Sequence, residues 1–137
     1  MPADDGNEPD SRPVVHVLVS EAFFRSRIVD TLNALVLGPC LADMDLDEDD
    51  FVEAVAGVPA QGLVADLEEE SRDVLSALGR LRQDPRTADW IWLCYCSHER
   101  EELVAEAARL GLEAVPRSTF ASSLVRLLQG FTAREEG

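Results

Sequence analysis

The sequence predicts an α/β protein with a doubly wound (βα)5 fold, in which five parallel strands alternate with five helices. Apolar runs of strand length alternate along the chain with segments whose apolar residues recur at helical spacing. The run at residues 90–96 is apolar on both faces, as a central strand of a parallel sheet should be. Polar residues end several of these runs, and a parallel sheet brings such ends to one edge.

The strands are predicted from short apolar runs bounded by polar, glycine or proline residues. We place them at about 14–19, 40–44, 62–67, 90–96 and 113–116.

Each of these runs is followed by a segment with an apolar stripe of helical period. We place the helices at about 21–36, from the acidic run before Phe51 to residue 57, at 71–83, at 99–110 and from Ser118 onward. The stripe of the last helix is formed by Phe120, Leu124, Leu127 and Leu128.

Capping residues set the expected ends of these helices. Gly38-Pro39 ends the first helix, and Gly111 is a natural C-cap for the fourth. The acidic run before Phe51 suits the positive N-terminus of the second helix. Ser118 is the expected N-cap of the fifth helix.

The two ends of the chain carry no hydrophobic period. Residues 1–12 are acidic and contain proline and glycine, so we expect a disordered tail, and residues 132–137 form a short polar tail. Residues 13–131 are expected to form one domain, since 137 residues are enough for a single core. The N-terminus lacks the basic and apolar regions of a signal peptide.

The charge of the chain excludes several classes of partner. It has 27 acidic residues and 12 basic ones, all arginine, which give a formal net charge of −15. Such a surface repels phosphate backbones and anionic lipid headgroups, so we expect neither nucleic acid nor membrane as a partner. The 3 cysteines lie in apolar, strand-like segments, which favours reduced thiols in a cytoplasmic protein.

Three other patterns have ordinary structural explanations. The acidic run at 43–50 lacks the glycine and the final glutamate of a calcium loop, and is better explained as a solvated helix start. Cys94 and Cys96 with His98 have poor spacing for zinc, and Cys96-His98 as nucleophile and base has no third member. No glycine-rich loop follows the first strand, so a dinucleotide enzyme is disfavoured.

Residues at the ends of three strands should converge at the carboxyl edge of the sheet. Ser20-Glu21 ends the first strand, Asp66 the third, and Cys96-Ser97 the fourth. This layout resembles the receiver (CheY-like) domain of two-component response regulators, whose acceptor aspartate ends the third strand. The resemblance implies a flavodoxin-like sheet with strand order 2-1-3-4-5.

The resemblance covers about residues 13–131. Its most specific part is Leu81-Arg-Gln-Asp-Pro-Arg-Thr-Ala-Asp89, which is similar to the stretch that many receivers carry between the third helix and the fourth strand. The spacing from Asp66 to Cys96, and then to Gly111, also fits the receiver pattern.

By this resemblance Asp66 takes the phosphoacceptor position, and Glu21 takes one position of the acidic pair that binds magnesium. Ser20 stands where the other acid would be. Cys96, followed by Ser97, takes the Thr/Ser switch position, and Val115 takes that of the switch aromatic. The lysine position falls on Arg117-Ser118, since the chain has no lysine.

These departures weaken the expected chemistry. Phosphorylation of an aspartate needs a divalent cation held by several carboxylates, and only Glu21 and Asp66 remain as ligands, so we expect weak magnesium binding at most and no other cofactor. Arg117 replaces the lysine in charge but not in compact geometry. A cysteine at position 96 donates hydrogen bonds poorly.

We therefore expect a stand-alone receiver-like signalling module that acts through protein–protein interaction without phosphorylation, a pseudo-receiver without enzymatic activity. The alternative is a single-domain response regulator phosphorylated on Asp66 by a histidine kinase, and a small α/β enzyme is a distant third. We expect a monomer or weak homodimer whose partner is a signalling or kinase protein. Arg109, Arg117 and Arg126 mark the expected interaction face, formed by the fourth helix, fifth strand and fifth helix.

Overall fold

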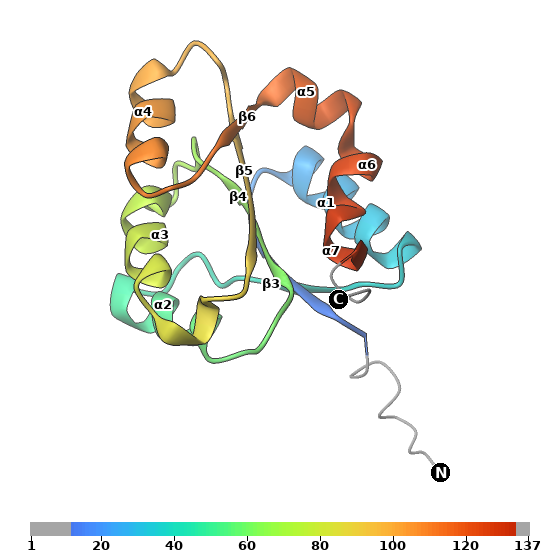
Figure 1. Cartoon of the computed structure of the whole chain (residues 1–137), viewed down its shortest axis with the longest axis horizontal. Helices are drawn as coiled ribbons and strands as arrows, with labels where there is room; N and C mark the ends of the chain where they lie inside the picture. The colour runs from blue at the N-terminus through green and yellow to red at the C-terminus, as the bar shows by residue number, and fades with distance from the viewer. Residues whose placement is uncertain (1–11, 134–137) are drawn as a thin grey trace.

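Five parallel strands form one sheet at the centre of the molecule in the computed structural model, which describes residues 12–133 (Figure 1). The strands run in the order β3-β2-β4-β5-β6, so the predicted order 2-1-3-4-5 is confirmed. Their bounds are Val14–Leu18 for β2, Gly38–Leu41 for β3, Gly62–Asp66 for β4, Ile91–Cys96 for β5 and Ala114–Pro116 for β6.

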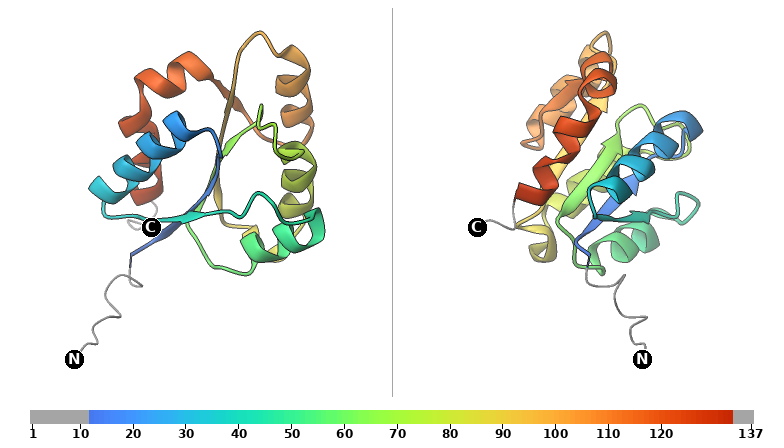
Figure 2. Two further views of the ribbon diagram at one scale, coloured as in Figure 1. Left: turned by 180° about the vertical axis from the view of Figure 1, so that it is seen from behind. Right: turned by 90° about the vertical axis from the view of Figure 1, so that its right-hand side faces the viewer.

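Helices cover both faces of this sheet, as Figures 1 and 2 show. One face carries α2, α3 and α4, which span Glu48–Ala56, Val74–Arg82 and Glu101–Arg109. The other carries α1 and the C-terminal helices α5, α6 and α7, which span Ala22–Ala34, Arg117–Ser122, Leu124–Leu128 and Gly130–Ala133. Two apolar clusters, one on each face, form the core.

The central strand β4 is buried along its whole length because it lies between β2 and β5 and its side chains enter the apolar clusters on both faces of the sheet. Its first residue, Gly62, meets the backbone of Ile91 so closely that a Cβ there would lie 1.9 Å from the Ile91 carbonyl oxygen. Only glycine allows this approach of the two strands, which sets the register that places Asp66 opposite Tyr95.

The second strand begins earlier than the predicted 40–44. The chain leaves α1 through Val36, which adopts the left-handed conformation with φ 62°, and the Leu37 N–H donates to the Leu32 carbonyl. This turn closes the helix before the glycine and proline, so Gly38 and Pro39 lie inside β3 rather than in a connection. Proline is tolerated there because β3 is an edge strand.

The C-terminal helix differs from the prediction in two ways. The predicted N-cap at Ser118 is wrong, because β6 runs directly into α5 through Pro116 and Ser118 lies inside the helix. The helix is also interrupted at Ser123, where φ is −119° and ψ is 26°, and continues as α6 and α7 to Ala133, beyond the expected domain boundary at residue 131. A short 3-10 helix, η2 (Pro85–Thr87), was not predicted between α3 and β5.

The tail predicted at residues 1–12 lies outside the described residues except for Arg12, and so do residues 134–137. Within the part that the structure describes, no helix is both long and apolar enough to cross a membrane.

Candidate functional site

The carboxyl ends of the central strands surround an open pocket of about 630 Å³. Loops after β2, β4 and β5 and the start of α5 supply its walls. Acidic side chains outnumber the basic ones, since the lining residues are Ser20, Glu21, Glu68, Glu69, Glu70, Ser71, Arg100 and Arg117.

Asp66 lies at the base of this region, as the last residue of β4 and 5% exposed. Its Oδ1 accepts a hydrogen bond of 2.8 Å from the Glu68 N–H and lies 3.9 Å from Nη2 of Arg117. Burial raises the pKa of Asp66, although the Glu68 N–H and the Arg117 charge act in the opposite direction. Asp66 therefore lies at the carboxyl edge of the sheet, as predicted, but one of its carboxylate oxygens already accepts a hydrogen bond from the loop that follows β4.

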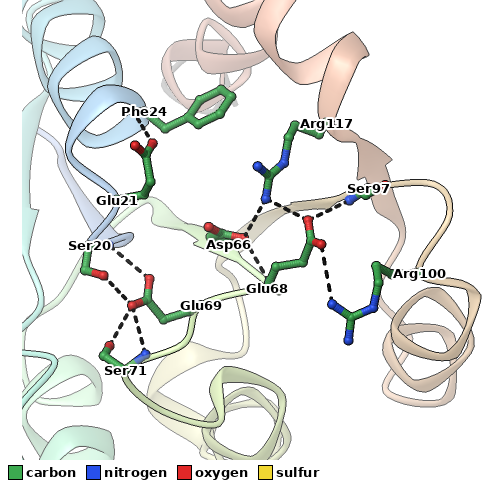
Figure 3. A network of polar contacts seen from close by, with 10 residues as sticks. All are labelled: Ser20, Glu21, Phe24, Asp66, Glu68, Glu69, Ser71, Ser97, Arg100 and Arg117. Carbon is green, nitrogen blue, oxygen red and sulfur yellow. Dashed lines mark hydrogen bonds and ion pairs between the residues drawn. The ribbon is translucent and has the colours of Figure 1, made fainter.

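Glu21, which also lies at this edge, is engaged with the helix that it precedes. It is the N-cap of α1, and its carboxylate accepts hydrogen bonds from the N–H groups of Phe24 at 2.9 Å and Phe23 at 3.2 Å. Figure 3 shows this carboxylate turned toward the start of α1. The side chain thus satisfies free backbone donors at the helix start.

Ser20, which stands at the other position of the predicted acidic pair, is hydrogen-bonded to Glu69. Its N–H donates to Glu69 Oε1 at 3.0 Å, and its hydroxyl donates to the other carboxylate oxygen. Ser71 adds two more donors, its hydroxyl at 2.6 Å and its N–H at 3.3 Å. Burial would raise the pKa of Glu69, but the hydrogen bonds from Ser20 and Ser71 hold it below its usual value.

Glu68 connects the β4–α3 loop to two other elements (Figure 3). Its Oε1 accepts the Ser97 N–H at 2.9 Å and Nη2 of Arg117 at 2.6 Å. Its Oε2 lies 3.5 Å from Nη1 of Arg100. Arg117 therefore contacts Glu68 much more closely than it contacts Asp66.

An aromatic cluster lies beneath the arginine at position 117. The Tyr95 ring stacks on Phe120 with centroids 4.0 Å apart, and Phe24 contacts both rings. The Arg117 guanidinium lies over Phe24 at 5.7 Å. The hydroxyl of Tyr95 and Nε of Arg117 are buried without a hydrogen-bond partner among residues 12–133.

The residues predicted at the switch positions lie in different environments. Cys96 is buried in the cluster under α2, α3 and α4, and burial raises the pKa of its thiol. Ser97 is half-buried, and its N–H rather than its hydroxyl faces the site through Glu68. Val115 packs against the opposite cluster, with Tyr95. Ser118, which shares the predicted lysine position with Arg117, is exposed in the first turn of α5.

The three arginines expected to share an interaction face have different neighbours. Arg109 lines a groove with Asp73, Ser76 and Glu106, between α3 and α4. Arg126 lines another with Arg27, between α1 and α6. Arg117 lies in the central pocket, and the structure brings only this one to the site.

Sequence reasoning missed the pairing of Glu69 with the two serines and the approach of Arg100. The signal that was available is the run of three consecutive glutamates directly after Asp66. Such a run is usually a solvated surface, and nothing local distinguishes the two engaged glutamates from Glu70. Within residues 12–133, no three His, Cys, Asp or Glu side chains are arranged to hold one metal ion.

Comparison with known proteins shows similarity of fold without similarity of sequence. No family model matches the chain, and no curated protein is significantly similar to it. The receiver domain of a DNA-binding response regulator from Colwellia psychrerythraea 34H superposes with a TM-score of 0.71 at 16% identity, over 88% of this chain and 98% of that one.

Two further solved structures agree. A two-component response regulator from Clostridium difficile gives a TM-score of 0.70 at 8% identity, over 92% of this chain and 100% of that one. A chemotaxis response regulator of Vibrio cholerae gives 0.67 at 14% identity, over 88% and 98%. The chain has the fold of response-regulator receiver domains.

Proposed function

We propose that this protein is a receiver-like signalling module that acts by binding other proteins and does not depend on phosphorylation of Asp66. The observation that carries the proposal is the direction of the Glu21 carboxylate, which caps α1 through the Phe23 and Phe24 N–H groups. In a receiver this residue position supplies charge for the metal that assists phosphoryl transfer.

The energetic argument is that four carboxylates at this edge already have internal donors, those of Glu21, Asp66, Glu68 and Glu69. Moving Glu21 onto a cation would expose the first backbone donors of α1, which costs about 1 kcal/mol. Ser20 contributes a hydroxyl where a second carboxylate would be needed, and that hydroxyl is held by Glu69. Magnesium, which prefers several oxygen ligands in a strict geometry, would therefore bind weakly to Glu21 and Asp66.

The proposed partner is a signalling protein, such as a kinase component, rather than nucleic acid or membrane. The formal net charge of −15 opposes binding to polyanions. Arg109, Arg117 and Arg126 are the proposed contact residues on a predominantly acidic surface, and basic side chains among acids suit a polar protein interface.

The test is quantitative affinity capture with wild-type protein and the Asp66→Asn variant as baits. The proposal expects the same partners at the same yield from both baits. Charge reversal at Arg109 or Arg126 is expected to lower the yield while the melting temperature stays within about 2 °C of wild type, since surface substitutions usually change stability by less than about 0.5 kcal/mol. The proposal would be refuted if the Asp66→Asn bait lost its partners while the charge-reversal variants kept theirs.

A second candidate function is a single-domain response regulator in which Asp66 accepts a phosphoryl group from a histidine kinase. The observation in its favour is the aspartate itself, buried at the end of β4 with Nη2 of Arg117 3.9 Å from its Oδ1.

A further inference from the structure

We infer that Arg117, Arg100 and the Ser97 N–H form an anion-binding site whose ligand is the protein's own Glu68 carboxylate. This intramolecular ligand joins the β4–α3 loop to the β5–α4 loop and to the start of α5, beside Asp66. The inference rests on the proposed function and deepens it, since it identifies Glu68 as the carboxylate that pairs with Arg117 at the site. Its test does not depend on any partner protein.

The three donors come from two parts of the fold, the β5–α4 loop and the start of α5. Ser97 follows β5, Arg100 is the residue before α4, and Arg117 is the first residue of α5. They converge on one carboxylate, with separations of 2.9 Å for the Ser97 nitrogen, 3.5 Å for Arg100 and 2.6 Å for Arg117. Convergence of two guanidinium groups and a backbone N–H is the pattern by which proteins bind carboxylates and phosphates.

Partial burial makes the Glu68–Arg117 contact more than a surface ion pair, whereas Arg100 is 46% exposed and its Nε also donates to Glu102 at 2.7 Å. The Glu68 side chain is 17% exposed, and Arg117 is 40% exposed with its Nε buried. Charge-assisted hydrogen bonds in such places are stronger than exposed pairs, which contribute little.

The choice of Glu68 over its neighbours follows from the backbone of the loop. The Glu68 N–H donates to Asp66 Oδ1, which fixes the backbone at position 68 above the aspartate. Glu69 is held on the other side by Ser20 and Ser71. Glu70 is exposed and makes no hydrogen bond within the described residues. One of three consecutive acids is therefore placed to reach both arginines.

Removal of the internal ligand should leave a site for an external one. In Glu68→Ala, the Ser97 N–H and the two guanidinium groups lose their shared acceptor, and an added anion can replace it. We use sodium acetate, which supplies the missing carboxylate, and inorganic phosphate as probes. Each is titrated against chloride at constant ionic strength while the Ser97 amide and arginine Nε–H resonances are followed by NMR.

The matched control is Glu70→Ala, which removes the same charge two residues away. We expect saturable shifts of the Ser97 and Arg117 resonances in Glu68→Ala, with a Kd about tenfold lower than in wild type or Glu70→Ala. Two restored charge-assisted hydrogen bonds are ample for the roughly 1.4 kcal/mol that tenfold represents. Adding Arg117→Ala to the Glu68→Ala variant should abolish the saturation.

The inference is overturned if folded Glu68→Ala shows no saturable response to either anion, or if Glu70→Ala responds equally. Should Glu68→Ala fail to fold, Glu68→Gln serves instead, because its amide oxygen can keep the Ser97 N–H while the charge is lost. Arginine Nε–H resonances that stay at their wild-type positions in Glu68→Gln would also overturn it. A phosphorylated Asp66 in wild-type protein would refute the proposed function without altering these titrations.

Discussion

Replacing Tyr95 by phenylalanine should stabilise the protein, which is unusual for a substitution at a fully buried residue. The ring is 0% exposed and stacks on Phe120 at 4.0 Å, and phenylalanine keeps these contacts. The hydroxyl has no hydrogen-bond partner among residues 12–133. A buried polar group without a partner costs about 1–3 kcal/mol, while the lost van der Waals contacts of one oxygen atom offset part of the gain.

We therefore expect Tyr95→Phe to raise the free energy of unfolding by about 1 kcal/mol, which corresponds to about 3–4 °C in melting temperature for a domain of this size. Urea denaturation should show a higher midpoint with an unchanged m value. The control Tyr95→Ala removes the ring as well and should cost about 3–5 kcal/mol. If Tyr95→Phe is destabilising by 1 kcal/mol or more, the hydroxyl has a stabilising partner and the reasoning is wrong.

Three other substitutions test the fold and its titrating groups. Gly62→Ala should cost at least about 3 kcal/mol in urea denaturation, because its Cβ would lie 1.9 Å from the carbonyl oxygen of Ile91; a loss below about 1 kcal/mol would contradict the strand register. His16 is buried and hydrogen-bonded to the Val58 carbonyl, and burial lowers its pKa below 6.5, so the unfolded chain takes up the proton first. The stability of the wild type should thus fall as pH drops below about 6.5. The difference in unfolding free energy between wild type and His16→Leu should change with pH between pH 7 and 5, and a difference that stays constant over this range would contradict the prediction. Burial raises the pKa of Asp66, so its ionised form is disfavoured in the folded state. Asp66→Asn should therefore be more stable than wild type at pH 7, and this difference in stability should shrink as pH falls through the pKa of the folded state. A variant less stable than wild type at pH 7 would contradict the prediction.

The alternation of strands and helices was predictable because its signals are local and repeated, while the strand order followed from the resemblance to receiver domains. Each strand is an apolar run of limited length, and parallel connections through helices restrict the order of strands. The turn after α1 was harder, since a valine rather than a glycine takes the left-handed position at Val36. Sequence reasoning therefore assigned Gly38 and Pro39 to the end of the helix rather than to β3.

The positions of the site residues were also predictable, but their pairings were not. Asp66 and Glu21 reach one edge because parallel strands end there. The contact between Glu68 and Arg117 joins residues 49 positions apart, and no local pattern distinguishes Glu68 from the next two glutamates. The capping role of Glu21 depends on its side-chain direction, which competes with metal binding and is decided only by the folded loop.

The central claim, that signalling by this protein does not use phosphorylation of Asp66, is tested most directly by intact mass spectrometry. The wild-type protein is incubated with acetyl phosphate and magnesium, with Asp66→Asn as the control for modification elsewhere. The carboxylates of Glu21 and Glu69 already accept hydrogen bonds from within the protein, and Glu68 forms an ion pair with Arg117. We expect the unmodified mass alone in both proteins. A stable gain of one phosphoryl group in wild type, absent in Asp66→Asn, would contradict the account and favour the phosphorylated response regulator.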